Sequence, residues 1–268
     1  MVSGLCSQIQ LIHMLLVDWL FYVLVCSGGP LTGHAKNMTH GGCSVSSLTA
    51  VYQPVVHLDT GMVTYHESLI RHARGASEHL NVIQFSEEYG LIGMLDLHVL
   101  GETIVKLRQA KSDVSIGVNI SGYTLENSLN NLLSVLFKNR DIAHRLVFEI
   151  TETYKVNHQD VVAEFASALR LAGAKLAIDD LWSGHATFDQ VQKIRPDYVK
   201  TASQVMQDLI EAESHRWMRT LVSEVRKLGG EIIVEHVDAK AKLDILKKLG
   251  IKYGQGFYLG KPQNLELN

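Results

Sequence analysis

The sequence predicts an α/β protein whose main part folds as a (β/α)8 barrel of the TIM type. The first observation is that eight short runs of apolar and β-branched residues recur between about residue 48 and the end of the chain. The second is that segments of helical periodicity alternate with these runs. The third is that no glycine-rich phosphate loop follows any run, which disfavours dinucleotide-binding and P-loop folds. Eight strands over this length fit a closed barrel better than an open sheet.

Each predicted strand is a short run rich in valine, isoleucine, leucine or aromatic residues. In chain order the predicted strands are 50–58, 63–71, 115–121, 146–151, 175–180, 198–202, 231–237 and 253–259. Between them, residues 161–173 have apolar side chains at helical spacing, and Gly173 is a typical helix stop. The stretch 203–228 has the same character and ends before Gly229. These patterns predict two of the covering helices.

Composition limits the class of protein before any motif is considered. The chain has 268 residues, of which 46% are hydrophobic, so it can bury a sizeable core and is not disordered. A formal net charge of −3 is too close to zero for holding a nucleic-acid polymer by bulk electrostatics. All three cysteines precede residue 44, which excludes a disulfide framework or a cysteine metal site in the main body.

The first 44 residues are predicted to be a segment separate from the barrel, which then spans 45–268. Residues 11–26 are mostly apolar, but the run is short for a membrane span and contains Asp18. Residues 1–10 have no lysine or arginine, unlike a secretory signal. Three interpretations stay open: a membrane anchor, an amphipathic or packing helix, and sequence upstream of a true start at Met38.

Polar side chains interrupt the apolar runs near the ends of seven predicted strands. A carboxylate in such a place is costly unless it is paired or bound to a metal. Because barrel enzymes carry their chemistry at the carboxyl ends of the strands, we expect these side chains to converge. They are Glu67, Asn119, Glu149, Asp179, Asp180, Lys200, Glu235 and Gln255.

The chemistry of this set favours hard divalent cations. Several carboxylates and one amide, without cysteine or paired histidine, suit Mg²⁺ or Mn²⁺. Two such ions, about 3.5–4 Å apart, would clamp the attacking and leaving oxygens of a phosphodiester displacement. Lys200 is the one predicted strand-end cation, and it could orient a water molecule or offset phosphoryl charge. The residues alone therefore lead to metal-dependent phosphodiester hydrolysis.

Eight short motifs in order resemble the serial motifs of the EAL domain family, from about residue 45 to residue 262. They are YQPVV (52–56), ESLIR (67–71), VNIS (118–121), FEITET (148–153), AIDD (177–180), RPDYVK (195–200), IIVEHVD (232–238) and YGQGFYLGKP (253–262). The resemblance implies a modified (β/α)8 barrel that hydrolyses the bacterial second messenger cyclic di-GMP to linear pGpG. It also implies a cytoplasmic location, with anchoring through residues 11–26 left open.

The resemblance also implies a role for each matching position. Glu67, Asn119, Glu149 and Asp179 would bind one metal ion, and Asp179 would bridge to a second ion held by Asp180 and Glu235. Lys200 would contact the nucleophilic water, with Gln255 nearby and Glu235 as general base. Gln53, Leu69 and Arg71 match substrate-binding positions, and Glu152 matches a residue that anchors the loop after the Asp pair.

Departures from the family pattern keep a second function open. The family usually has Phe-Gly-Thr/Ala-Gly after the Asp pair, whereas this chain has 181–184 as Leu-Trp-Ser-Gly. That loop helps to arrange the second metal and, in the family, a homodimer contact. The alternative to a phosphodiesterase is therefore a catalytically silent domain that binds cyclic di-GMP or a protein partner.

Overall fold

The structure is a computed structural model that describes residues 48–72, 78–110, 113–151, 159–181, 188–201, 203–210 and 214–265. The described residues fall into two compact units. One takes those of 1–50 and 70–94, and the other takes 51–69 and those of 95–268. The predicted N-terminal segment, its boundary at residue 44, Glu152 and most of the altered loop lie outside the described residues.

Eight strands close into a barrel in the order β1 to β8, which confirms the predicted fold class. They are β1 Leu48–His57, β2 Val63–His72, β3 Ile116–Ser121, β4 Leu146–Thr151, β5 Lys175–Leu181, β6 Tyr198–Thr201, β7 Glu231–Val234 and β8 Tyr253–Gln255. Every predicted strand is present. The last two end earlier than predicted: His236 (φ 59°) follows β7, and the chain turns after β8 at residues 257–259.

The first strand departs from a regular (β/α)8 barrel. Strands β2 to β8 pair in parallel with one another, but β1 pairs antiparallel with β8, with Val55 opposite Gln255. Only a short turn connects β1 to β2, and the His57 N–H donates to the Met62 carbonyl across it. A connection of this length leaves no room for a crossover helix, so β1 runs against the other strands. Its N-terminal half therefore reaches the end of the barrel where the parallel strands finish.

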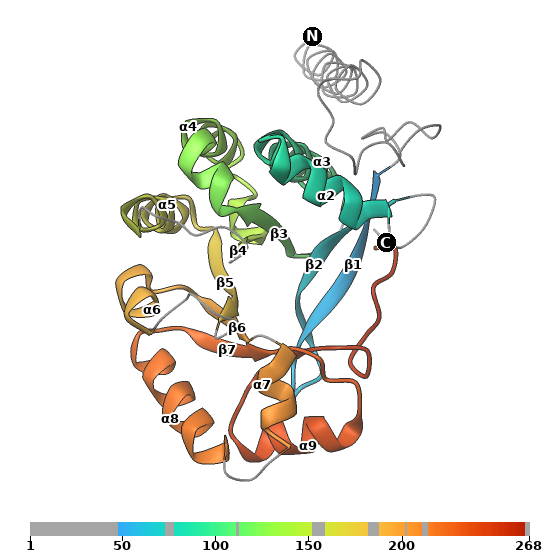
Figure 1. Cartoon of the computed structure of the whole chain (residues 1–268), viewed down its shortest axis with the longest axis vertical. Coiled ribbons are helices and arrows are strands. Elements are labelled where there is room, and N and C mark those ends of the chain that lie inside the picture. Colours follow the sequence, from blue (N-terminus) through green and yellow to red (C-terminus); the bar gives the residue numbers. More distant parts are fainter. Residues whose placement is uncertain are drawn as a thin grey trace. The chain divides into compact units, whose positions relative to one another are not determined.

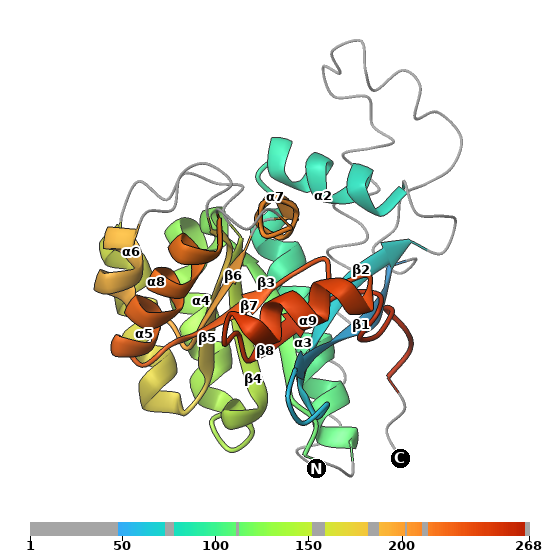
Figure 2. The same cartoon turned by 90° about the horizontal axis from the view of Figure 1, so that it is seen from below.

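Helices α4, α5, α6 and α8 lie outside strands β3 to β7 (Figures 1 and 2). The helices are α2 Glu78–Glu88, α3 Ile92–Gln109, α4 Gly122–Lys138, the short 3-10 turn Ala143–Arg145, α5 Gln159–Ala172, α6 Phe188–Ile194, α7 Ser203–Asp208, α8 Ser214–Lys227 and α9 Lys240–Lys248. No helix among the described residues has the length and apolar character needed to cross a bilayer.

The two predicted helices have different outcomes. Helix α5 agrees with the predicted 161–173, and Gly173 (φ 81°) ends it as expected. The stretch 203–228 is not one helix, because it divides into α7 and α8. The His215 ring bonds to the Leu209 carbonyl at 3.0 Å, which satisfies a backbone acceptor just after α7.

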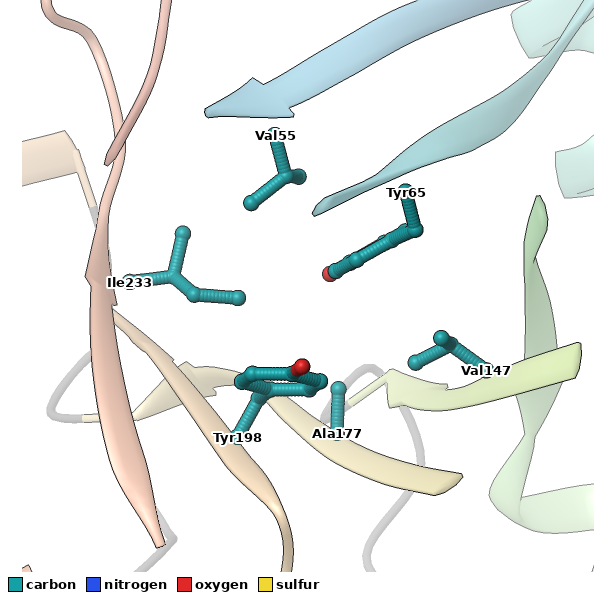
Figure 3. Close-up of a cluster of buried hydrophobic side chains, with 6 residues drawn as sticks. All are labelled: Val55, Tyr65, Val147, Ala177, Tyr198 and Ile233. Carbon is teal, nitrogen blue, oxygen red and sulfur yellow. The ribbon is translucent and has the colours of Figure 1, made fainter. Parts of the chain in front are cut away.

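Inside the barrel, one layer of side chains forms an apolar floor, shown in Figure 3. Its members come from six strands, and Tyr253 of β8 packs against it. They are Val55, Tyr65, Val147, Ala177, Tyr198 and Ile233. Because side chains on a strand alternate between the two faces, the residue two positions along each strand also points inward. This period places a second layer on the floor, and that layer is polar.

Candidate active site

The polar layer contains most of the residues that the sequence predicts for the site. Six of the eight members lie two positions along the chain from a floor residue, as Glu67 follows Tyr65 and Glu149 follows Val147. Gln255 follows Tyr253, which packs against the floor, and Asn119 follows Gly117. On the antiparallel β1 the direction is reversed, so Gln53 precedes Val55. The layer comprises Gln53, Glu67, Asn119, Glu149, Asp179, Lys200, Glu235 and Gln255.

Lys200 lies at the centre of this layer and is fully buried. Its ammonium group contacts four carboxylates from four different strands or strand ends. The distances from Nζ are 2.7 Å to Glu149, 3.0 Å to Glu235, 3.1 Å to Glu67 and 3.4 Å to Asp179. One positive charge thus faces four acidic groups, and the site has an excess of negative charge when all of them are ionised.

Glu67 is held by neutral neighbours as well as by Lys200. The amide of Asn119 donates to Oε1 at 3.2 Å, and the amide of Gln255 donates to Oε2 at 2.7 Å. Burial raises the pKa of Glu67, but the Lys200 charge and these hydrogen bonds outweigh it and leave the pKa below its ordinary value. Glu67 is therefore ionised at neutral pH.

The pKa values of Glu149 and Glu235 are shifted in the opposite direction, above their ordinary value. Burial raises the pKa of Glu149 to about 8, and the charges of Glu67 and Asp179 add to the effect against the opposing pull of Lys200. Burial likewise raises the pKa of Glu235 to about 7, helped by Asp179. Carboxyl groups with pKa values near neutrality can exchange protons at physiological pH, as a general base must.

The donor set fits a divalent cation. Glu67, Glu149 and Asp179 each offer an oxygen, and these oxygens lie within 4.8 Å of one another. Asn119 Oδ1, Glu149 Oε1 and Gln255 Oε1 are buried and have no hydrogen-bond partner among the described residues. Buried oxygens without donors are costly, and a hard cation would satisfy those beside the carboxylates. The oxygen set and its surplus charge therefore suit Mg²⁺ or Mn²⁺.

The second half of the predicted metal set is only partly described. The β5–β6 register shifts between Ile178 and Leu181, so a strand irregularity coincides with the Asp pair. Asp179 is half-buried beside Lys200, whereas the side chain of Asp180 lies outside the described residues.

The predicted substrate-binding residues are placed differently from one another. Gln53 is buried and donates from Nε2 to the Gly260 carbonyl at 3.2 Å. Leu69 is half-buried, and the strand period puts it on the same face of β2 as Glu67. Arg71 belongs to the other compact unit, where its Nη1 donates to the Ile70 carbonyl at 2.7 Å.

Two residues of the site, Gly117 and Tyr65, are not among those that the sequence predicts. Gly117 precedes Asn119 by two positions on β3, and a Cβ there would lie 2.3 Å from Glu149 Oε1 and 2.8 Å from the Tyr65 ring. A glycine inside a strand is a signal of close approach, so it could have been found. Tyr65 gave no such signal, because aromatic residues are common in strands.

The raised pKa of Glu149 predicts how pH affects the metal-free protein. A carboxyl with a higher pKa in the folded than in the unfolded chain gives stability that is complete below about pH 4 and lost as pH rises through about 8. A cation must displace that proton. We expect the gain in melting temperature on adding Mn²⁺ to chelator-treated protein to be larger at pH 8 than at pH 6. An equal or smaller gain at pH 8 would contradict this assignment.

Comparisons with known proteins agree with this fold. Residues 39–262 match the family model of the EAL domain. The cyclic di-GMP phosphodiesterase PdeB of Shewanella oneidensis is 27% identical over 232 residues, which are 82% of this chain and 27% of that protein. The chain thus spans about a quarter of the length of that curated relative.

Solved structures show the same architecture at lower identity. The PaMucR phosphodiesterase in complex with c-di-GMP superposes with a TM-score of 0.70 at 22% identity, covering 82% of this chain and 93% of that one. A manganese and cyclic di-GMP complex of BlrP1 from Klebsiella pneumoniae gives 0.69 at 21% identity, covering 81% and 56%.

Proposed function

The chain belongs to the EAL domain family, and on that premise we propose that it is a metal-dependent phosphodiesterase that opens cyclic di-GMP to linear pGpG. The observation that carries the proposal is the buried ring of four carboxylates around Lys200, with unpaired oxygens on Glu149 and Asn119. A ring of this kind is costly in a protein that has no cation to bind. The relative PdeB is named a cyclic di-GMP phosphodiesterase, which supports the substrate.

Three of the residues that would hold metal, Glu67, Glu149 and Asp179, have oxygens that converge. Glu67, Asn119, Glu149 and Asp179 would bind one Mg²⁺ or Mn²⁺ ion, and Asp179, Asp180 and Glu235 would hold a second. Such ions supply Lewis-acid stabilisation of phosphoryl charge and lower the pKa of bound water. The BlrP1 complex contains manganese together with cyclic di-GMP, which supports this choice of metal.

The chain's own groups would handle the proton and the developing charge. A water oxygen adds to one phosphorus, one phosphodiester P–O bond breaks, and the leaving ribose oxygen takes up a proton. Glu235, with its pKa raised by burial to about 7, would accept the proton of the water. Burial lowers the pKa of Lys200, but the four carboxylates outweigh it and keep the pKa well above the ordinary value, so Lys200 would act as a fixed cation.

Other residues would position the dinucleotide. Gln255 is fixed by its bond to Glu67 and would lie beside the water, while Gln53 and Leu69 would line the substrate groove. Arg71 is assigned to the same groove and Glu152 to the loop after the Asp pair, from the family pattern alone. These roles remain predictions.

A silent receptor is the second candidate, and the sequence change at 181–184 after the Asp pair favours it. The two functions separate when binding and turnover are measured together. We expect the full chain with Mg²⁺ or Mn²⁺ to convert cyclic di-GMP to pGpG, as measured by chromatography beside an active relative. Binding of cyclic di-GMP without product under both metals, while the relative turns over, would leave the receptor as the function.

A further inference from the structure

Two buried oxygens at the proposed metal site, one of them on a metal-binding group, have no hydrogen-bond partner among the described residues. They are the hydroxyl of Tyr65 and Oε1 of Glu149. Tyr65 is 1% exposed and Glu149 is fully buried, so neither oxygen is paired with bulk water. Leaving a buried polar group unpaired costs about 1–3 kcal/mol. A phenylalanine would fill the same space in the floor without this cost.

The two side chains share one small space, which exists because β3 has a glycine there. The point that a Gly117 Cβ would occupy lies 2.3 Å from Glu149 Oε1 and 2.8 Å from Cε2 of Tyr65. Tyr65 therefore fills the floor position that β3 leaves open, and it does so directly beside the Glu149 carboxylate.

The orientation of the Tyr65 ring is fixed by its neighbours. It packs against the ring of Tyr198 with centroids 5.7 Å apart, and Figure 3 shows its hydroxyl aimed into the barrel interior. The hydroxyl of Tyr198 already has a hydrogen-bond partner, because Lys175 at the start of β5 donates to it at 3.0 Å. Of these two floor tyrosines, only Tyr65 has a hydroxyl without a hydrogen-bond partner among the described residues.

We propose that the Tyr65 hydroxyl donates a hydrogen bond through one buried water to Oε1 of Glu149, and so positions this carboxylate for metal binding. The proposal rests on the proposed metal-dependent function. Tyr65 is a positioning residue, because it acts on the cation through Glu149. Partners of this kind fix the orientation of a ligand and strengthen it as a donor.

The chemistry of the two groups fixes the direction of the hydrogen bond. A phenol hydroxyl carries a proton that it can donate, and a carboxylate oxygen accepts. Tyr65 is therefore the donor and Glu149 Oε1 is the acceptor.

The test is Mn²⁺ binding by calorimetry to the full-length wild type, Tyr65→Phe and Tyr198→Phe, with thermal unfolding of each metal-free protein. We expect Tyr65→Phe to bind Mn²⁺ about 10-fold more weakly, as for other outer-shell partners. Tyr198→Phe loses a floor hydroxyl that bonds to Lys175 and not to a metal-binding group, so it should bind Mn²⁺ like the wild type. This contrast separates positioning from packing, because a packing role would lower the melting temperature and leave Mn²⁺ affinity alone.

The outcomes distinguish the proposal from its premise. If Tyr65→Phe binds Mn²⁺ within about twofold of the wild type, the positioning role is wrong and the metal site stands. If the wild type itself binds no Mn²⁺, the proposed metal site fails and the role of Tyr65 fails with it.

Discussion

Replacing Lys200 with methionine is expected to lower the free energy of unfolding of the metal-free protein by about 3–5 kcal/mol at pH 8, the range for breaking a buried ion pair. The substitution keeps a long unbranched side chain and removes the one charge that contacts four carboxylates. Without it, the buried carboxylates repel one another with no cation to offset them.

The loss should depend on pH in a definite direction. Without the ammonium, the carboxyl pKa values rise further, so at low pH these groups are protonated and cost little. As pH rises they must ionise in the folded protein, so the loss should be larger at pH 8 than at pH 6.

Urea unfolding at the two pH values, with chelator present, measures this loss. Lys175→Met is the matched control, because Lys175 is exposed at the other end of the barrel, where it bonds to Tyr198. We expect Lys175→Met to cost about 1 kcal/mol, the usual net contribution of one hydrogen bond. A Lys200→Met loss no larger than that of the control would show that the ammonium is not what stabilises the ring.

Unlike Lys200→Met, Glu149→Gln should not destabilise the metal-free protein at pH 8, and its main effect should be on activity. The amide has nearly the shape of the carboxyl but cannot ionise, so it mimics the protonated state that burial favours. We expect the metal-free variant to lose the fall in stability between pH 6 and pH 8. For one proton that fall is at most about 1.4 kcal/mol per pH unit.

The same variant should lose the metal and with it the reaction. Outer-shell partners alone cost about 10–100-fold, so the loss of a direct ligand should lower turnover of cyclic di-GMP by more than about 10²-fold. Glu231→Gln is the control, because Glu231 lies at the start of β7 and pairs with Arg226 and Lys252 away from the site. A Glu149→Gln variant that is less stable than the wild type at pH 8 and still turns over cyclic di-GMP would contradict both the raised pKa of Glu149 and its role as a metal ligand.

The sequence predicts some of the features on which these two predictions depend, but not the central position of Lys200. The strand 146–151 was predicted to the residue, and the convergence of Glu67, Glu149 and Asp179 followed from the rule for barrel strand ends. Lys200 was predicted beside a water molecule, yet its place at the centre of the carboxylates depends on how deep each side chain reaches. The alternation of residues along a strand predicts on which face of the sheet a side chain lies, but it does not predict how far that side chain extends into the barrel.

The antiparallel β1 and the floor below the site show the same limit. Gln53 could be assigned only through the family pattern, because its strand runs against the others. The pairing of Tyr65 with Gly117 is a contact between neighbouring strands, and neither residue alone indicates the other. By contrast, polar interruptions such as Glu149 within an apolar strand carry their own signal, because burial of a charge needs a reason.

The most direct test of the central claim is to add Mn²⁺ stepwise to chelator-treated full-length protein with cyclic di-GMP and to follow pGpG. We predict no product without the ion and a rate that rises with Mn²⁺ until the protein is saturated, because the buried carboxylates around Lys200 are the proposed ligands of the ion. Saturable Mn²⁺ binding with no pGpG at any concentration, or product that forms equally well in chelator, would contradict the account.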